Sequence, residues 1–171
     1  AILFETSDQL RKNAEGIKNK LMGTEEECYD LYAANILNNS FTGTSGPDSK
    51  SLCATDHPLK AGGTSANKAA SAIALNASNV QAGISYMALT KNNQGIIKPR
   101  IPSYLVVHTA LMGTAYEICD STLKAGTANN DVNILKSRFG LEAVPWKNLT
   151  SSTGWWLSCK KENNGLLIYR T

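Results

Sequence analysis

The feature that most constrains this chain is a helical stretch near its start, residues 7–41, which holds the longest hydrophobic periodicity in the sequence. A helix with one apolar stripe cannot bury that stripe alone, because a single helix has no core of its own. We therefore expect a later part of the chain, or another copy of it, to lie against the stripe. Its first apolar residues recur at steps of four, three and four: Leu10, Ala14, Ile17 and Leu21.

Two helix-start signals lie within this stretch. Ser7 suits the N-cap of a helix, and Asp8 places negative charge in its first turn. Directly after Gly23, Thr24 followed three residues later by Glu27 forms a capping box. The pattern predicts either one long helix bent near Gly23 or two helices placed end to end.

Length and charge exclude several classes of protein. The 171 residues suit one domain or two small ones. The formal net charge of +3 is too small to argue for a nucleic-acid-binding face, which needs clustered Lys and Arg. No apolar run is long enough to cross a bilayer, and the start lacks the pattern of a signal peptide. Because the chain begins at Ala1 without Met, we expect it to be a piece of a longer polypeptide.

The four cysteines indicate the redox compartment of the protein. Cys28, Cys53, Cys119 and Cys159 are far apart in the sequence and form no CxxC pair. Without a secretion signal, such cysteines are typical of reduced thiols in a cytosolic protein. We expect all four to be buried and reduced.

The middle of the chain begins with a long loop. From residue 38 to about residue 78 the sequence is crowded with Asn, Ser, Thr, Gly and Pro, which predicts a loop with a short strand at Leu52-Cys53. His57-Pro58 is expected to be extended, because proline disfavours the helical region for the residue before it. Loops of this length are usually functional or bound by a partner.

A clear helix follows the loop. Ser78 and Gln81 form another capping box, so Ser78 is predicted to cap a helix that ends at residues 92–95. One face of this helix is marked at helical spacing by Val80, Ile84, Met87 and Lys91, with Ala88 beside it.

The second half of the chain alternates a helix with short strands. The run Tyr104-Leu105-Val106-Val107 is typical of a buried strand, and we expect a helix directly after it, from His108 to about Leu123. Asn163-Asn164-Gly165 favours a hairpin turn. Together these elements predict an α+β fold with a small mixed or antiparallel sheet. Its other strands are expected at Leu141 to Trp146, Gly154 to Cys159 and Leu166 to Tyr169.

The residues that could carry chemistry form no complete motif. Cys53 and His57 have metal-like spacing, but a zinc site needs two further ligands and no paired motif supplies them. Asp56 precedes His57, yet adjacent residues rarely face each other. His108 follows an apolar strand, where catalytic residues do occur, but it equally suits the start of a helix. No residue is therefore predicted to be catalytic, to bind a cofactor or to bind a metal ion.

Two other hypotheses belong to different classes of protein. In the first, the chain is a small cytosolic α+β enzyme in which His57, His108 and a cysteine line a cleft. In the second, it is a carbohydrate- or peptide-binding module that uses an exposed indole of Trp155 or Trp156. Against the second, the two indoles of adjacent strand residues are expected to pack on opposite faces of the sheet.

Several of these features recur in an order that matches a known family. A long helical segment leads into the following motifs: Asp48 to Cys53, Thr55-Asp56-His57-Pro58, Gly62-Gly63, Asn67, Gly95, Pro102 to Val107, the helix with Leu111 to Ala115, Asn129, Asn133, Leu149-Thr150 and Trp155-Trp156-Leu157. In their order and spacing, from about Thr24 to Tyr169, they resemble the major capsid proteins of tailed bacteriophages. The resemblance is specifically to the major head subunit of Mu-like phages and prophages.

The resemblance implies the Hong Kong ninety-seven type of capsid fold. In that fold a long spine helix and a narrow sheet form a peripheral domain, and a compact α+β axial domain packs around the local symmetry axes. Residues 1–57 would be the peripheral-domain part with the spine helix and a connecting loop, and residues 58–157 the axial domain. Residues 158–171 would be a strand that returns to the peripheral domain.

The same resemblance implies a structural protein rather than an enzyme. Such a subunit assembles with copies of itself into hexamers and pentamers of an icosahedral or prolate shell that encloses the genome. Its implied partners are other copies, scaffold, portal and decoration proteins, and encapsidated DNA bound without sequence specificity, with no membrane and no cofactor. Its implied location is the virion capsid, assembled in the host cytoplasm. Neighbouring copies would then cover the helical stripe and the long loop.

The sequence departs from the family pattern in two ways. Ser49 follows Asp48 where the family usually has Gly, so the turn at this point is expected to differ. The N-terminal arm and extended loop that precede the spine helix in the family are absent, as is the usual end of the chain. Processing or an incomplete chain accounts for this, and no cross-linking residue can be carried over.

Overall fold

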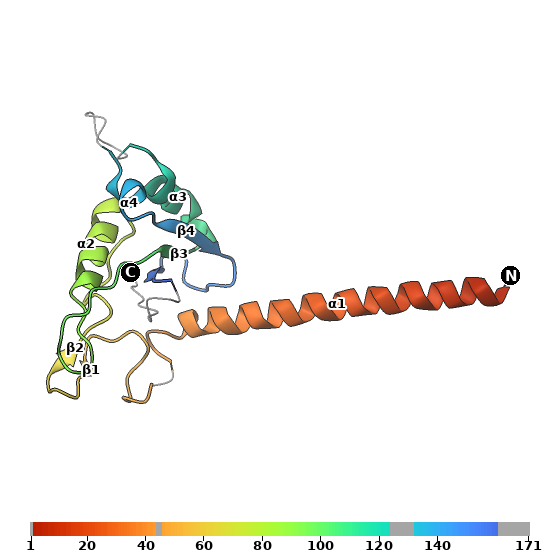
Figure 1. Cartoon of the computed structure of the whole chain (residues 1–171), viewed down its shortest axis with the longest axis horizontal. Coiled ribbons are helices and arrows are strands. Elements are labelled where there is room, and N and C mark those ends of the chain that lie inside the picture. Colours follow the sequence, from red (N-terminus) through yellow and green to blue (C-terminus); the bar gives the residue numbers. More distant parts are fainter. Residues whose placement is uncertain (1, 44–45, 124–131, 161–171) are drawn as a thin grey trace. The chain divides into compact units, whose positions relative to one another are not determined.

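The computed structural model describes residues 2–43, 46–123 and 132–160, with the backbone alone for residues 2–10. The chain divides into two compact units, residues 1–36 and residues 37–171. The first unit is a stretch of one long helix, α1, and the second holds a three-stranded sheet with three α-helices around it (Figure 1).

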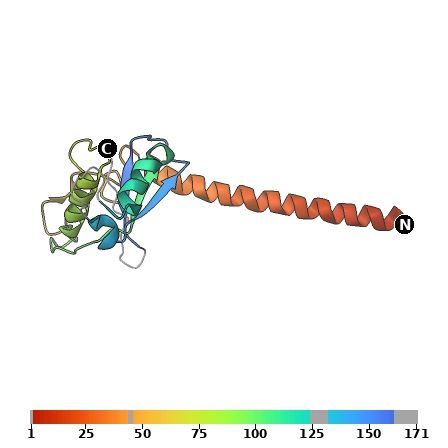
Figure 2. The ribbon, with the colours of Figure 1, turned by 90° about the horizontal axis from the view of Figure 1, so that it is seen from above.

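Helix α1 spans Ile2–Asn38 without interruption, and both views show it straight (Figures 1 and 2). The predicted bend or break near Gly23 is therefore wrong. The Thr24 hydroxyl donates to the Lys20 carbonyl one turn earlier (2.9 Å), as threonine does inside a helix, so it caps no new helix. An internal glycine costs only about 1 kcal/mol relative to alanine, too little to break a long helix. Ser7 lies inside α1 rather than at its start.

The three-stranded sheet of the second unit is mixed, which is one of the two forms that the sequence predicted. β3 (Tyr104–His108) lies in the centre, parallel to β4 (Glu142–Trp146) and antiparallel to β5 (Trp155–Ser158). Pro145, which cannot donate to a ladder, lies in an edge strand, where proline is tolerated. Parallel pairing of β3 and β4 needs a crossover, which the helices between them supply.

Strand alternation divides the core into two parts. Successive side chains of a strand point to opposite faces, so Leu105 and Val107 of β3 share one face with Trp155 and Leu157 of β5. This face is covered by helices α2 (Ala77–Ala88), α3 (Met112–Asp120) and α4 (Ile134–Ser137), whose buried residues complete the larger cluster: Val80, Ile84, Met87, Ala115, Ile118, Cys119 and Leu135.

The opposite face of the sheet carries the smaller cluster. Trp156 of β5 is buried there, with Val106 and Trp146 partly buried around it. The C-terminal end of α1 and the segment that follows it cover this face through their apolar residues, Leu37, Phe41 and Cys53, together with Leu149. The Asn38 side chain connects the same segment to the β4–β5 connection: its Nδ2 donates to the Asn148 carbonyl (3.0 Å), and its Oδ1 accepts from the Thr150 N–H (2.9 Å).

The N-cap of α2 is two residues earlier than predicted. Asn76, not Ser78, caps the helix, with its Oδ1 accepting from the Asn79 N–H at 2.8 Å. The predicted face is confirmed for Val80, Ile84 and Met87, which are buried, but not for Lys91, which is exposed and lies beyond the end of α2 at Ala88. On the same face Gly83 allows close approach to β5, because an added Cβ would lie 2.9 Å from Leu157 Cδ1.

The helix predicted from His108 to Leu123 is shorter. His108 is the last residue of β3, and its Nδ1 accepts from the Ala110 N–H (2.9 Å) to cap a short 3-10 helix, η1 (Thr109–Leu111), which leads into α3. Helix α4 was not predicted. Asn133 begins it and is buried, accepting from the Leu135 N–H and donating to the carbonyls of Ile118 and Ser121.

The long loop contains little regular structure among its described residues. Leu52-Cys53 is not a strand, whereas His57–Pro58 forms β1 and pairs antiparallel with β2 (Thr64–Ser65). Ser49 has a φ of 59°, the left-handed conformation that favours the glycine expected there by family resemblance. The strand predicted at 166–169 and the turn at 163–165 lie outside the described residues.

Candidate functional site

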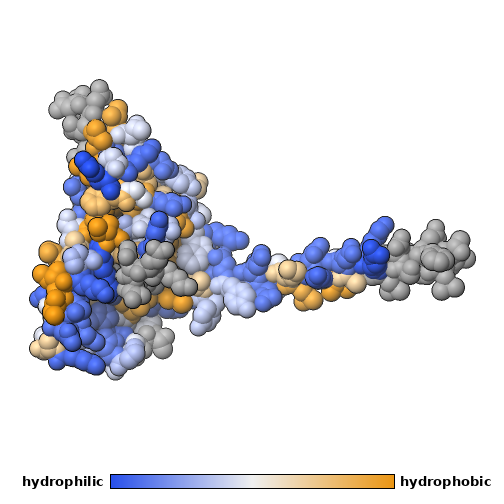
Figure 3. All heavy atoms as spheres, in the orientation of Figure 1, coloured by the Kyte–Doolittle hydropathy of each residue, from blue (hydrophilic) through white to orange (hydrophobic). Residues whose placement is uncertain are grey.

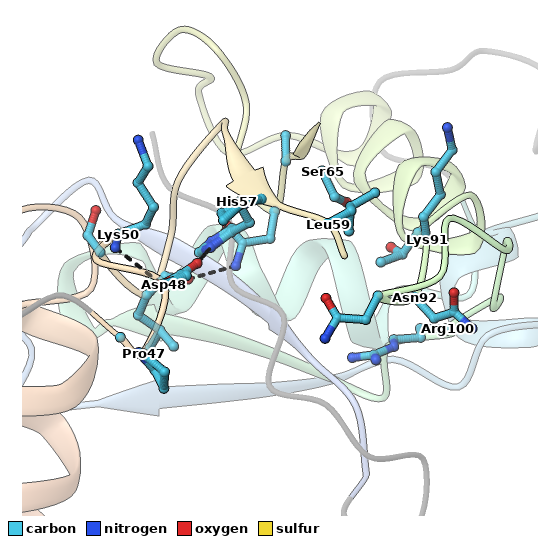
Figure 4. Close-up of a pocket in the computed structure, with 17 residues that line it drawn as sticks. Pro47, Asp48, Lys50, His57, Leu59, Ser65, Lys91, Asn92 and Arg100 are labelled. Atoms are coloured by element: carbon cyan, nitrogen blue, oxygen red, sulfur yellow. Dashed lines mark hydrogen bonds and ion pairs between the residues drawn. The ribbon is translucent and has the colours of Figure 1, made fainter. Parts of the chain in front are cut away.

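The long loop and the segment after α2 together line the pocket shown in Figure 4. Its volume is about 560 Å³. His57 lies in its wall, with Lys50 from the loop and with Lys91 and Arg100 from the segment after α2. His57 therefore lies at a cavity, as a catalytic histidine must, whereas His108 is not part of this pocket.

Both ring nitrogens of His57 are engaged. Nδ1 lies 2.5 Å from Oδ2 of Asp48, and Nε2 lies 3.2 Å from Oδ1 of Asn67. The Asn67 amide is itself held by the backbone, since its Oδ1 accepts from the Ala54 N–H (2.8 Å) and its Nδ2 donates to the Leu52 carbonyl (2.6 Å). A general base needs a free nitrogen within reach of its substrate, and here neither nitrogen is free.

The Asp48, His57 and Asn67 side chains therefore act as a structural clamp on the loop. They join three points spread over about twenty residues of chain that has almost no ladder hydrogen bonds of its own. Asp56, which was considered as a partner of His57, instead pairs with Lys50. The sequence alone predicted no chemical role for Asp48 or Asn67. Both residues stood out only as members of the series of motifs that resembles phage capsid proteins.

The clamp predicts a pH dependence of stability. The hydrogen bond from His57, with a smaller contribution from the Lys50 N–H, holds the pKa of Asp48 below its ordinary value of 3.8. The carboxylate is stabilised in the folded chain. Its contribution to the free energy of unfolding is therefore complete above the pKa of the unfolded state and is lost as pH falls through the lower pKa of the folded state. Asp48→Asn should thus lower stability at neutral pH and flatten the loss of stability that begins as pH falls below about 5 and continues below 3.8.

Urea unfolding at a series of pH values measures this effect. Asp56→Asn is the matched control, because it removes a carboxylate of the same loop that pairs only with an exposed lysine in the described part. Equal stability of Asp48→Asn and the unaltered chain at neutral pH would contradict the clamp.

The residues of the hypothetical enzyme cleft do not meet. His108 caps η1 and is not among the residues that line the pocket of His57, and no cysteine lines that pocket. Cys53 is buried in the smaller core cluster. Within residues 11–43, 46–123 and 132–160, no group of three His, Cys, Asp or Glu side chains is placed to hold a metal ion.

The binding module with an exposed indole is also contradicted. Trp155 and Trp156 are 2% and 1% exposed, and they belong to the larger and the smaller core cluster respectively. The Trp155 indole N–H donates to the Ile73 carbonyl (2.9 Å), and that of Trp156 to the Ser40 hydroxyl (3.4 Å). The expectation of one indole on each sheet face is confirmed.

The cysteines fall into two classes, which corrects the expectation that all are buried. Cys53, Cys119 and Cys159 are buried, whereas Cys28 of α1 is exposed. Burial raises the pKa of the Cys53 and Cys119 thiols to about 12 and raises that of Cys159. The thiolate is the nucleophile, so these three should react slowly.

Thiol titration checks this difference. In the unassembled chain at mildly alkaline pH, we expect Ellman's reagent to modify Cys28 rapidly and the other three thiols only after denaturation. Cys28→Ser should remove the fast phase and leave the slow one. Fast modification of more than one thiol in the folded chain would contradict the assigned burial.

The largest uncovered apolar surface of the first unit lies on α1. We call it the α1 stripe and define it as Ile17, Leu21, Cys28, Leu31 and Tyr32, which recur at helical spacing and are all exposed. Figure 3 shows apolar side chains along one side of the helix and hydrophilic ones along the other. Nothing else in residues 1–36 can cover this stripe, because the unit is helix alone.

Length and hydropathy bear on what this helix could contact. Although α1 has 37 residues, no helix in the described part of the chain is apolar enough to span a membrane. The apolar residues of the stripe recur at helical spacing, so the stripe is one face of an amphipathic helix.

Comparison with known protein families identifies a match. A family model described as phage capsid protein matches residues 9–169, which is nearly the whole chain. No curated protein and no solved structure gave a significant match.

Proposed function

This chain belongs to the phage capsid protein family, and on that premise we propose that it is a major head subunit of the Mu-like phage and prophage type, with the Hong Kong ninety-seven type of fold. Proteins of this family are structural and form the capsid of the virion. In the proposal, copies of the chain associate into hexamers and pentamers that close an icosahedral or prolate shell around the genome.

The proposal assigns parts of the chain to the capsid domains. Residues 1–57 belong to the peripheral domain, with α1 as the spine helix, residues 58–157 form the axial domain, and residues 158–171 return to the peripheral domain. The mixed sheet with helices on one face is consistent with an axial domain of α+β type.

The observation that carries self-association is the exposed α1 stripe. Four of its side chains, Ile17, Leu21, Leu31 and Tyr32, are between 51% and 72% exposed. Burying a large apolar side chain contributes about 1.5–3 kcal/mol, so leaving several in water is costly. Contiguous exposed apolar surface marks interaction sites, and in a shell every copy supplies such a surface to its neighbour.

Further partners follow from the same proposal. Scaffold, portal and decoration proteins would bind the assembling shell, and packaged DNA would contact it without sequence specificity. Assembly would take place in the host cytoplasm. Neither a cofactor nor a catalytic residue is needed for these roles.

The particle mass of the intact gene product tests the proposal. The product is expressed from its full reading frame, with any upstream scaffold, and its fastest-sedimenting fraction is imaged by electron microscopy. Shells or capsomer rings are expected. A well-behaved monomer or dimer under these conditions would overturn the assembly role.

A further inference from the structure

We infer that the α1 stripe of one copy packs on a specific surface of a second copy, the hairpin formed by residues 89–101. This inference rests on the proposed function and names the two surfaces that meet. The occupant of the hairpin is thus the α1 helix of a neighbouring chain, in a head-to-tail contact.

The hairpin is a defined structural element. Lys91 and Ile97 pair across an antiparallel bridge, and the Lys98 N–H donates to the Thr90 carbonyl at 2.8 Å. The turn is closed by Asn92, whose side chain accepts from the N–H groups of Gln94 and Ile96. The surface is therefore held in shape before any partner binds.

The hairpin combines exposed aliphatic side chains with positive charge. Four aliphatic residues within these 13 positions are 51 to 63% exposed: Leu89, Ile96, Ile97 and Ile101. Paired residues of an antiparallel bridge share a face, so Lys91 lies on one face with Ile97. The segment also contains Lys98 and Arg100 and no acidic residue.

The C-terminal half of the α1 stripe has the opposite charge. From residue 21 to residue 38 the helix carries four carboxylates, Glu25, Glu26, Glu27 and Asp30, and no basic residue. At about 100° per residue, Glu25 lies about 20° beyond one edge of the stripe and Glu27 about 40° beyond the other, so both carboxylates flank it. Each surface thus offers apolar side chains beside charges, and the two sets of charges are complementary.

The charge balance of the two units points the same way. Seven acidic and four basic residues give residues 1–36 a formal charge of −3, so the +3 of the whole chain leaves +6 on residues 37–171. Parallel pairing of α1 with α1 would bring the acidic halves of two helices together, and any pairing of α1 with α1 would leave the aliphatic residues of the hairpin in water. Pairing of α1 with the hairpin covers both apolar surfaces and can repeat around a ring.

Cross-linking through the exposed thiol of the stripe tests the contact. The variant Ile97→Cys places a thiol on the hairpin of a chain that keeps Cys28 on α1, and assembled protein is treated with a short bismaleimide. A head-to-tail contact should give a ladder of covalent oligomers, because each copy both provides and receives a link. Ile97→Cys with Cys28→Ser, and Ser137→Cys with Cys28 retained, should give no ladder.

Charge exchange gives a second, independent readout. Lys91→Glu with Lys98→Glu should lose particles, Glu25→Lys with Glu27→Lys should lose them too, and the four changes together should restore them. Three results would each overturn the contact while leaving the capsid role intact. The first is particles of the Ile97→Cys variant that give no ladder, and the second is a cross-link within one chain. The third is a Leu21→Cys variant that forms cross-linked dimers between two copies of α1. Failure of the unaltered chain to assemble would overturn both.

Discussion

Replacing Trp156 with alanine is expected to lower the free energy of unfolding by about 3–5 kcal/mol, as for other buried Trp or Phe residues. Trp156 is 1% exposed and fills the space between the sheet and the segment after α1, beside Leu37, Cys53 and Leu149. The centroid of its ring also lies 6.2 Å from the centroid of the Phe41 ring. Truncation leaves a cavity that this small cluster cannot collapse to fill.

Urea denaturation followed by circular dichroism measures the loss. The matched variant is Trp156→Phe, which keeps an aromatic ring in the cluster and should retain most of the stability that alanine removes. Because a typical domain is stable by only about 5–15 kcal/mol, the alanine variant should be close to unfolding on warming. A loss below about 1 kcal/mol would mean that the smaller cluster is not a tightly packed core.

A double substitution in the α1 stripe, Leu21→Ser with Leu31→Ser, is expected to abolish particle formation. Each leucine removed from a buried contact costs about 1.5–3 kcal/mol, and the contact recurs at every subunit of a shell. Because the two residues belong to the helix unit, unfolding of the second unit should be unchanged. Sedimentation measures the particles, and urea unfolding measures the second unit.

The matched control lies on the opposite side of the same helix. Lys12→Ser with Glu26→Ser removes one positive and one negative charge, keeps the net charge, and leaves the stripe intact. This variant should assemble normally. If the leucine variant also assembles in normal yield, the stripe is not an assembly surface.

Helical and strand periodicity was sufficient to predict the main elements. Val80, Ile84 and Met87 repeat at helical spacing and are buried together, and the apolar run 104–107 is the central strand. The capping positions were less reliable, because several Asn, Ser and Thr residues near a helix start compete for one role. Asn76 took the role predicted for Ser78, and the Thr24 hydroxyl bonded back to its own helix.

The clamp on the long loop could not be derived from local pattern. Asp48, His57 and Asn67 are separated by nine and ten residues, in a segment without periodicity, and only the fold brings them together. Local pattern also could not show whether His108 and Cys53 meet His57 in a cleft, because that too depends on the fold. His108 and Cys53 each satisfy a local need, a helix start and a small core, in different parts of the second unit.

The sequence by itself determined that the start of the chain is helical with one apolar stripe, that the chain is α+β, and that one indole of Trp155-Trp156 packs on each sheet face, because these follow from fixed periods of 3.6 and 2 residues. It did not determine that α1 continues unbroken past Gly23. Only the tertiary structure decided that His57 is held at both nitrogens and that the 89–101 hairpin exposes its aliphatic residues. Contacts between residues far apart in the chain depend on how the elements pack, and no local pattern encodes them.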